Sequence, residues 1–124
     1  MDEATRHGVE EEVRAAFEAY ERALMENDVA ALVEIFADDE RTVRLTTDGG
    51  LFGIDEIAAF RRGRDPSDIA RTLTRVAIQA LEPTVAVASA TYTRTGSGRK
   101  GAQTQVWHRR PEGWRIVAAH VSLG

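Results

Sequence analysis

Four β-rich segments follow one another in the second half of this chain of 124 residues, with no helical period among them. The segments are 69–81, 85–95, 102–110 and 113–123. The turn motifs between them are Glu82-Pro83-Thr84, Gly96-Ser97-Gly98 and Pro111-Glu112-Gly113. Segments joined by such short turns pair as sequential hairpins, so the pattern predicts an antiparallel meander. Long strands that carry small residues must also twist and curve strongly.

The first half of the chain carries helical patterns instead. Apolar residues at three- and four-residue steps, and the caps beside them, predict helices at 9–24, 29–37 and 54–63. Asp28 is the expected N-cap of the second helix. The turn motif Asp48-Gly49-Gly50 predicts a hairpin at 41–52. The resulting order, α-α-β-β-α-β-β-β-β, defines an α+β roll in which three helices pack on a strongly curved antiparallel sheet.

The length fits one domain, 1–124, and composition narrows its class. The chain has no run of eighteen apolar residues, so no transmembrane helix is expected. It has no cysteine, which excludes disulfides, thiolate metal ligands and cysteine nucleophiles. Its N-terminal segment is polar and acidic, unlike a secretory signal. These features together predict a cytoplasmic protein.

Charge is distributed unevenly along the sequence. Residues 1–68 hold 18 of the 20 acidic residues, whereas 69–124 hold two acids and eight of the 16 basic residues. Two interpretations are open: a polyanion partner, or an acidic helical layer packed on a basic sheet. Without a lysine-rich run or interleaved aromatic and basic residues, we favour the second and expect no nucleic-acid or membrane surface. A pocket on the sheet would then contain arginines and almost no carboxylates.

Strand parity selects further candidates, because alternate side chains of a strand face opposite sides. Gln103, Gln105 and Trp107 share one face, and this polar lining predicts pocket positions for Gln105 and Trp107. In the last strand, residues 114, 116, 118, 120 and 122 are expected on one face, and both faces are apolar at the centre. This strand is therefore expected to be covered on both sides or to lie in a dimer interface.

His120 is the most informative titratable group, because it can act as base, acid or anion donor near neutral pH. A satisfied interior histidine is the alternative. Its own strand supplies no acidic residue to orient it, which argues against a catalytic triad. His7 and His108 stand at no ligand-type spacing from it, so no metal site is expected.

Tyr20 and three arginines complete the candidate set, each with a structural alternative. Tyr20 lies on the apolar stripe of the first helix, which buries its ring, so its hydroxyl needs a partner. Arg44 faces either a cavity or solvent, and Arg61 points inward or compensates a helix dipole. Arg71 begins the first long strand, where a solvated end is the alternative. The planar guanidinium of arginine can donate two parallel hydrogen bonds to a carboxylate, so these candidates together predict a small anionic ligand.

Six segments resemble one family. They are AFEAYERAL at 16–24, RTVR at 41–44, GIDEIAAFR at 53–61, ARTL at 70–73, QTQVW at 103–107 and WRIVAAHVS at 114–122. In this order they resemble the AtzH-like group of the SnoaL-like, nuclear transport factor 2-like proteins, which includes the oxalurate-catabolism protein HpxZ. The polar, glycine-rich TTDGG at 46–50 departs from the family pattern, where an aromatic residue is common.

The resemblance implies a cone that encloses a pocket between helices and concave sheet, usually in a homodimer. It also implies a role in bacterial ureide or s-triazine breakdown beside amidases, with any activity directed at small N-carboxylated or oxalyl ureas without a cofactor. The implied pocket positions are Tyr20, Arg44, Arg61, Arg71, Gln105 and His120.

These observations lead to one hypothesis and two alternatives. The hypothesis is a cofactor-independent enzyme that decarboxylates or hydrolyses a small carboxylated urea or amide. Arg44 and Arg71 would grip the carboxylate with help from Arg61, and Tyr20 or His120 would transfer the proton. One alternative is a non-catalytic anion-binding or accessory subunit of an amidase. The other is an isomerase or cyclase, which the absence of a sheet carboxylate disfavours.

Overall fold

The computed structural model describes residues 1–124 and confirms the predicted order of elements. The elements are α1 (Glu3–Glu26), α2 (Val29–Glu34), β1 (Val43–Thr46), β2 (Gly49–Phe52), α3 (Ile54–Gly63), β3 (Arg71–Glu82), β4 (Val85–Arg94), β5 (Lys100–Arg110) and β6 (Gly113–Leu123). α1 starts earlier than its apolar stripe predicts, because the Asp2 carboxylate caps it by accepting the Thr5 amide at 2.7 Å. α2 is shorter than predicted, because the chain after it bridges to β6 at Phe36.

The six strands form one sheet in the order β2-β1-β6-β5-β4-β3. β3 to β6 are the predicted antiparallel meander, but β1 runs parallel to β6, so the sheet is mixed rather than wholly antiparallel. The direction of β1 follows from where the chain leaves α2. The Ile116 amide donates to the Ile35 carbonyl and the Ala37 amide to the Ile116 carbonyl, both at 2.9 Å. These bonds place the start of β1 beside the first half of β6, and the chain continues in the same direction.

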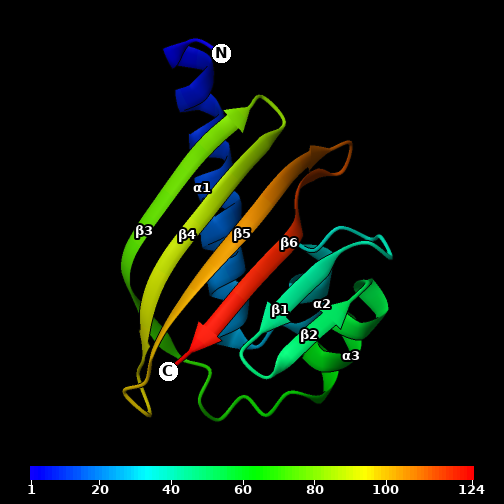
Figure 1. Cartoon of the computed structure of the whole chain (residues 1–124), viewed down its shortest axis with the longest axis vertical. Helices are drawn as coiled ribbons and strands as arrows, with labels where there is room; N and C mark the ends of the chain where they lie inside the picture. Colours follow the sequence, from blue (N-terminus) through cyan, green and yellow to red (C-terminus); the bar gives the residue numbers. More distant parts are fainter.

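The helices cover one face of this sheet, and the core lies between the two layers. Figure 1 shows α1 crossing behind β3 to β6, while α2 and α3 lie behind the hairpin of β1 and β2. β4 presents Ala86, Ala88 and Ala90 to the core, and these small side chains leave room for α1 and its buried Phe17. None of the helices is long and apolar enough to cross a membrane.

A β-bulge in β6 changes which side chains face the core. Trp107 pairs with Ile116, but the preceding Val106 pairs with Ala118, so Val117 is an extra residue. Before the bulge Trp114 and Ile116 are buried, and after it Ala119 is buried while His120 and Ser122 are exposed. The prediction that residues 114, 116, 118, 120 and 122 share one face is therefore wrong, because one inserted residue reverses the alternation.

Candidate functional site

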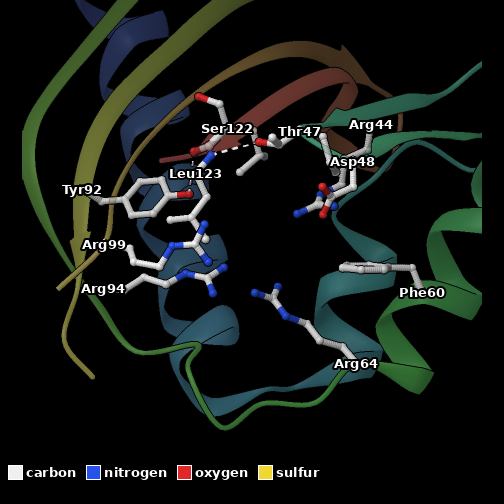
Figure 2. Close-up of a pocket in the computed structure, with 12 residues that line it drawn as sticks. Arg44, Thr47, Asp48, Phe60, Arg64, Tyr92, Arg94, Arg99, Ser122 and Leu123 are labelled. Atoms are coloured by element: carbon white, nitrogen blue, oxygen red, sulfur yellow. Dashed lines mark hydrogen bonds between the residues drawn. The ribbon is translucent and has the colours of Figure 1, made fainter. Parts of the chain in front are cut away.

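A cavity of about 220 Å³ opens between the β1–β2 hairpin, α3 and the adjoining ends of β4 and β6. Its lining residues are Arg44, Thr46, Thr47, Asp48, Phe60, Arg64, Tyr92, Arg94, Arg99, Val121, Ser122 and Leu123. Figure 2 shows the guanidinium groups of Arg64, Arg94 and Arg99 directed toward the same space, with Phe60 and Tyr92 on opposite sides of it. The lining thus contains four arginines but only one carboxylate, that of the exposed Asp48. The cavity is strongly cationic.

A second, smaller space of about 20 Å³ lies next to this cavity, and Tyr20 is among the residues that line it. Arg44, Arg64, Tyr92, Arg94 and Val121 line both spaces, which therefore adjoin, and we call the two together the pocket. The inner residues are Tyr20 and Leu24 of α1, Ile69, Arg71 of β3 and Gln103 of β5. The helical layer and the concave sheet face thus meet at the inner end.

Arg44 is a buried cation without a protein counter-ion. It belongs to β1, is 5% exposed, and its Cζ lies 4.8 Å from the centre of the Phe60 ring. Its Nε and Nη1 are buried and have no hydrogen-bond partner. The pKa of Arg44 is lowered to about 10: burial is the largest cause, and the charges of Arg61 and Arg64 add to it, while Tyr20 opposes it. Buried charges are normally paired, so this guanidinium is suited to an anion from solution.

Arg61 lies behind Tyr20 rather than in the cavity wall. It is 1% exposed, and its Nη2 donates to the Tyr20 hydroxyl at 3.0 Å. Burial by itself would raise the pKa of the Tyr20 hydroxyl, but the charges of Arg61, Arg44 and Arg71 outweigh it and lower the pKa below its ordinary value. Because Tyr20 accepts the bond from Arg61, its own O–H remains available as a donor at the inner end of the pocket.

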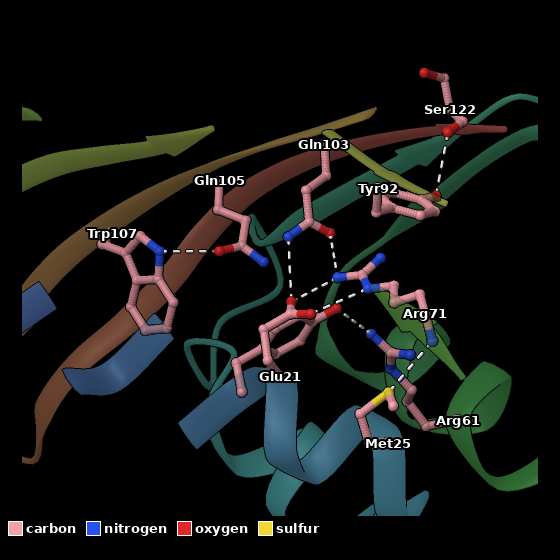
Figure 3. A network of polar contacts seen from close by, with 10 residues as sticks. Glu21, Met25, Arg61, Arg71, Tyr92, Gln103, Gln105, Trp107 and Ser122 are labelled. Atoms are coloured by element: carbon pink, nitrogen blue, oxygen red, sulfur yellow. Dashed lines mark hydrogen bonds and ion pairs between the residues drawn. The ribbon is translucent and has the colours of Figure 1, made fainter. Parts of the chain in front are cut away.

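Arg71 reaches the inner end of the pocket, but its charge is already compensated. Its Nε and Nη2 donate to the two carboxylate oxygens of Glu21 at 3.0 and 2.5 Å, and Nη2 also donates to Oε1 of Gln103 at 2.9 Å. Figure 3 shows this network linking α1, β3 and β5. Burial is the largest single effect and would lower the pKa of Arg71, but the hydrogen bond and charge of Glu21, with Tyr20 and Tyr92, together outweigh it and raise the pKa. Arg71 is therefore held by the protein, unlike Arg44.

Glu21 was not among the predicted site residues. It lies four residues after Phe17 and three before Leu24, at the edge of the apolar stripe of α1. That spacing is the one sequence signal that points to a partly buried carboxylate here.

Gln105 and Trp107 lie deeper than the pocket. The Trp107 indole N–H donates to Oε1 of Gln105 at 3.1 Å, and both side chains are fully buried in the core. They share a face with Gln103, as parity predicted, but Gln103 is the glutamine that lines the pocket.

His120 lies outside the site. It is exposed on the outer face of the sheet, paired with Thr104 of β5 and Leu45 of β1, because the bulge at Val117 turns it away from the helices. Of the two residues predicted as alternative proton donors, Tyr20 is the one that reaches the pocket.

Three arginines of the cavity were also not predicted. Arg64 follows α3, Arg94 ends β4, and Arg99 lies in the turn before β5. Burial lowers the pKa of Arg64, and Arg61 and Arg94 lower it further. The basic second half of the sequence indicated arginines near the sheet, but their convergence depends on the tertiary structure. No group of three or more histidine or acidic side chains lies in range of a common metal ion.

The family model for AtzH-like proteins matches residues 3–124. A protein of unknown function from Pectobacterium atrosepticum, of the DUF3225 family, is 50% identical over 94% of this chain and 91% of its own, with a TM-score of 0.90. A cystatin-like fold protein from Burkholderia xenovorans is 37% identical over 94% and 92% of the two chains, with a TM-score of 0.87. A nuclear transport factor 2-like superfamily protein from Salmonella enterica is 26% identical over 94% and 91%, with a TM-score of 0.73.

No curated protein matches the chain significantly. The order of the elements and the mixed six-stranded sheet agree with the nuclear transport factor 2-like fold. The match over 3–124 covers the pocket from Tyr20 to Leu123. The chain belongs to the AtzH-like family.

Proposed function

We propose that this protein binds a small carboxylated urea or amide in the arginine-lined pocket and decarboxylates it without a cofactor. The observation that carries the proposal is Arg44, a buried guanidinium with two unpaired donor nitrogens, Nε and Nη1, at the wall of a cavity of about 220 Å³. A ligand carboxylate would supply the missing counter-ion and accept those bonds.

Arg44 and Arg64 form the proposed clamp, in place of the Arg44 and Arg71 pair expected from the sequence. Neither makes a hydrogen bond or ion pair to a carboxylate, whereas Arg71 is held by Glu21. Because burial and mutual repulsion raise the free energy of the two cations, binding an anion relieves both costs. The walls of Phe60 and Tyr92 keep part of the ligand away from water.

Tyr20 is the proposed proton donor. As the bond between nitrogen and the carboxyl carbon breaks, its electron pair returns to nitrogen, which takes the Tyr20 proton while carbon dioxide leaves. Arg61 then stabilises the phenolate through its 3.0 Å bond, and water returns the proton. A lowered pKa makes Tyr20 a stronger acid, which favours this transfer at neutral pH.

Hydrolysis is the weaker form of the proposal, because it needs a base to activate water. Glu21 is the carboxylate at the inner end, and both of its oxygens accept bonds from Arg71. The Gln103 amide also donates to it, at 3.4 Å. Because both oxygens already accept hydrogen bonds from the protein, Glu21 is not placed to take a proton from water, so the geometry supports decarboxylation better than hydrolysis.

An accessory role is the second candidate, and it is supported by the outer face of the hairpin. Phe52 is 64% and Leu45 37% exposed, and both belong to the face of the sheet that carries His120. Exposed apolar side chains of this size are typical of protein contacts. A second copy of the chain or an amidase would cover them under this proposal.

The test is to supply carboxylated ureas to the purified protein and to follow carbon dioxide and ammonia separately. Decarboxylation releases carbon dioxide and leaves a urea, whereas amide hydrolysis releases ammonia. Tyr20→Phe is expected to keep binding but lose turnover, and Arg44→Gln to lose binding. His120→Asn, on the outer face of β6, is the matched control and should keep both. Unchanged turnover in Tyr20→Phe and Arg44→Gln would refute the proposal.

A further inference from the structure

One aromatic ring lies against three guanidinium groups in this pocket. The centre of the Phe60 ring is 4.8 Å from Cζ of Arg44, 5.6 Å from Cζ of Arg61 and 5.7 Å from Cζ of Arg64. All three distances lie within the range in which the negative face of a ring attracts a cation. Phe60 belongs to α3 and is half-buried, and it lines the cavity.

Arg44, Arg61 and Arg64 have no carboxylate partner, unlike Arg71, which is the other buried arginine, and Arg94, which is partly buried as Arg64 is. Arg71 is paired with Glu21, and Arg94 contacts Asp68 at 3.5 Å. By contrast, Nε and Nη1 of both Arg44 and Arg61 are buried without any hydrogen-bond partner. Three like charges in a partly desolvated space repel one another, so some attraction must hold them there.

We propose that Phe60 replaces the counter-ion of this cluster, holding Arg44, Arg61 and Arg64 together while leaving their charge available to a ligand. A carboxylate in the same place would accept the guanidinium N–H bonds and cancel the charge, as Glu21 does for Arg71. A ring attracts the cation through its face and leaves the in-plane donors free. The inference deepens the proposed function, because it depends on the pocket being an anion site.

Phe60 is in this sense a positioning residue rather than a catalytic one. Through Arg44 and Arg64 it supports the proposed carboxylate clamp. Through Arg61 it supports the bond to the Tyr20 hydroxyl. One side chain therefore joins the binding end of the pocket to the proton-donating end.

The experiment replaces Phe60 with mono-, di- and trifluorinated phenylalanine in the full chain and measures the melting temperature without ligand. Fluorine withdraws charge from the ring face but barely changes its size, so a purely packing role predicts a flat series. We expect a stepwise fall that reaches about 4–8 °C for the trifluorinated ring, the loss of desolvated cation–π attraction in a domain of this size. Excess oxamate should make the fall in melting temperature smaller, because the bound anion then compensates the guanidinium charges next to Phe60.

Two controls decide the origin of the shift. The first control is the same fluorinated series at Phe17, which is buried in the core and whose ring no guanidinium group approaches. This series should not lower the melting temperature. In an Arg44→Met background the Phe60 series should become much flatter. A flat series in the wild type, or an equal fall with and without Arg44, would overturn the inference. Neither readout needs turnover, so the inference and the proposed reaction can fail separately.

Discussion

Replacing Arg44 with methionine should stabilise the protein when no ligand is present. Its pKa falls from the ordinary arginine value to about 10, which corresponds to a cost of about 3 kcal/mol at roughly 1.4 kcal/mol per unit. Because the folded pKa lies below the unfolded one, the folded state resists protonation. This cost is present in full below pH 10 and disappears as the pH rises from there toward the ordinary pKa of arginine. At neutral pH the folded wild type is therefore destabilised by the full cost of keeping Arg44 charged.

Arg44→Met removes this cost, but part of the resulting gain in stability is offset, because the mutation also removes the contact of Arg44 with the Phe60 ring. That contact contributes about 1–2 kcal/mol in a desolvated setting. The methionine retains much of the apolar stem, so little packing is lost. The net expectation is an increase of about 1–2 kcal/mol in the free energy of unfolding.

Arg71→Met is the matched comparison and should act in the opposite direction. It leaves the largely buried Glu21 carboxylate without its partner, at a cost of about 3–5 kcal/mol. Urea unfolding at pH 7, in a buffer without carboxylates, measures both variants. A loss of more than about 1 kcal/mol in Arg44→Met, or a change of stability in the same direction in both variants, would show that Arg44 is not an uncompensated buried charge.

Further variants test other parts of the site. Glu21→Gln should lower the melting temperature but strengthen oxamate binding measured by calorimetry, because Arg71 then adds an uncompensated charge to the pocket; weaker binding would contradict this. Turnover should fall as the pH rises through the lowered pKa of Tyr20, since only the protonated phenol donates, and a rate that stays flat to pH 10 would exclude Tyr20 as the donor. Deletion of Val117 removes the bulge and turns His120 inward, so it should abolish cooperative unfolding, while Val117→Ala should not.

The sequence predicted the fold well where local signals decide it. Three short turn motifs determine the β3 to β6 meander, and the apolar stripes locate α1 and α3. The parallel pairing of β1 with β6 was not predictable in this way, because it depends on bonds between Ile116 and the chain after α2.

The candidate site shows the same limit at the level of single side chains. Tyr20, Arg44 and Arg71 do line the pocket, and Arg61 lies directly behind it. His120 does not, because alternation along a strand holds only until a bulge interrupts it.

The sequence likewise could not show which buried arginine has a carboxylate partner. Arg44 and Arg71 are equivalent as residue types, and only the position of Glu21 on the facing helix distinguishes the free cation from the paired one.

Calorimetric titration with oxamate at low ionic strength tests the central claim most directly. We expect saturable binding of one oxamate per chain, lost in Arg44→Met and retained in Arg75→Met, which removes an exposed arginine from the outer face of β3. Absence of binding to the wild type, or equal binding by Arg44→Met, would contradict an anion site built around Arg44.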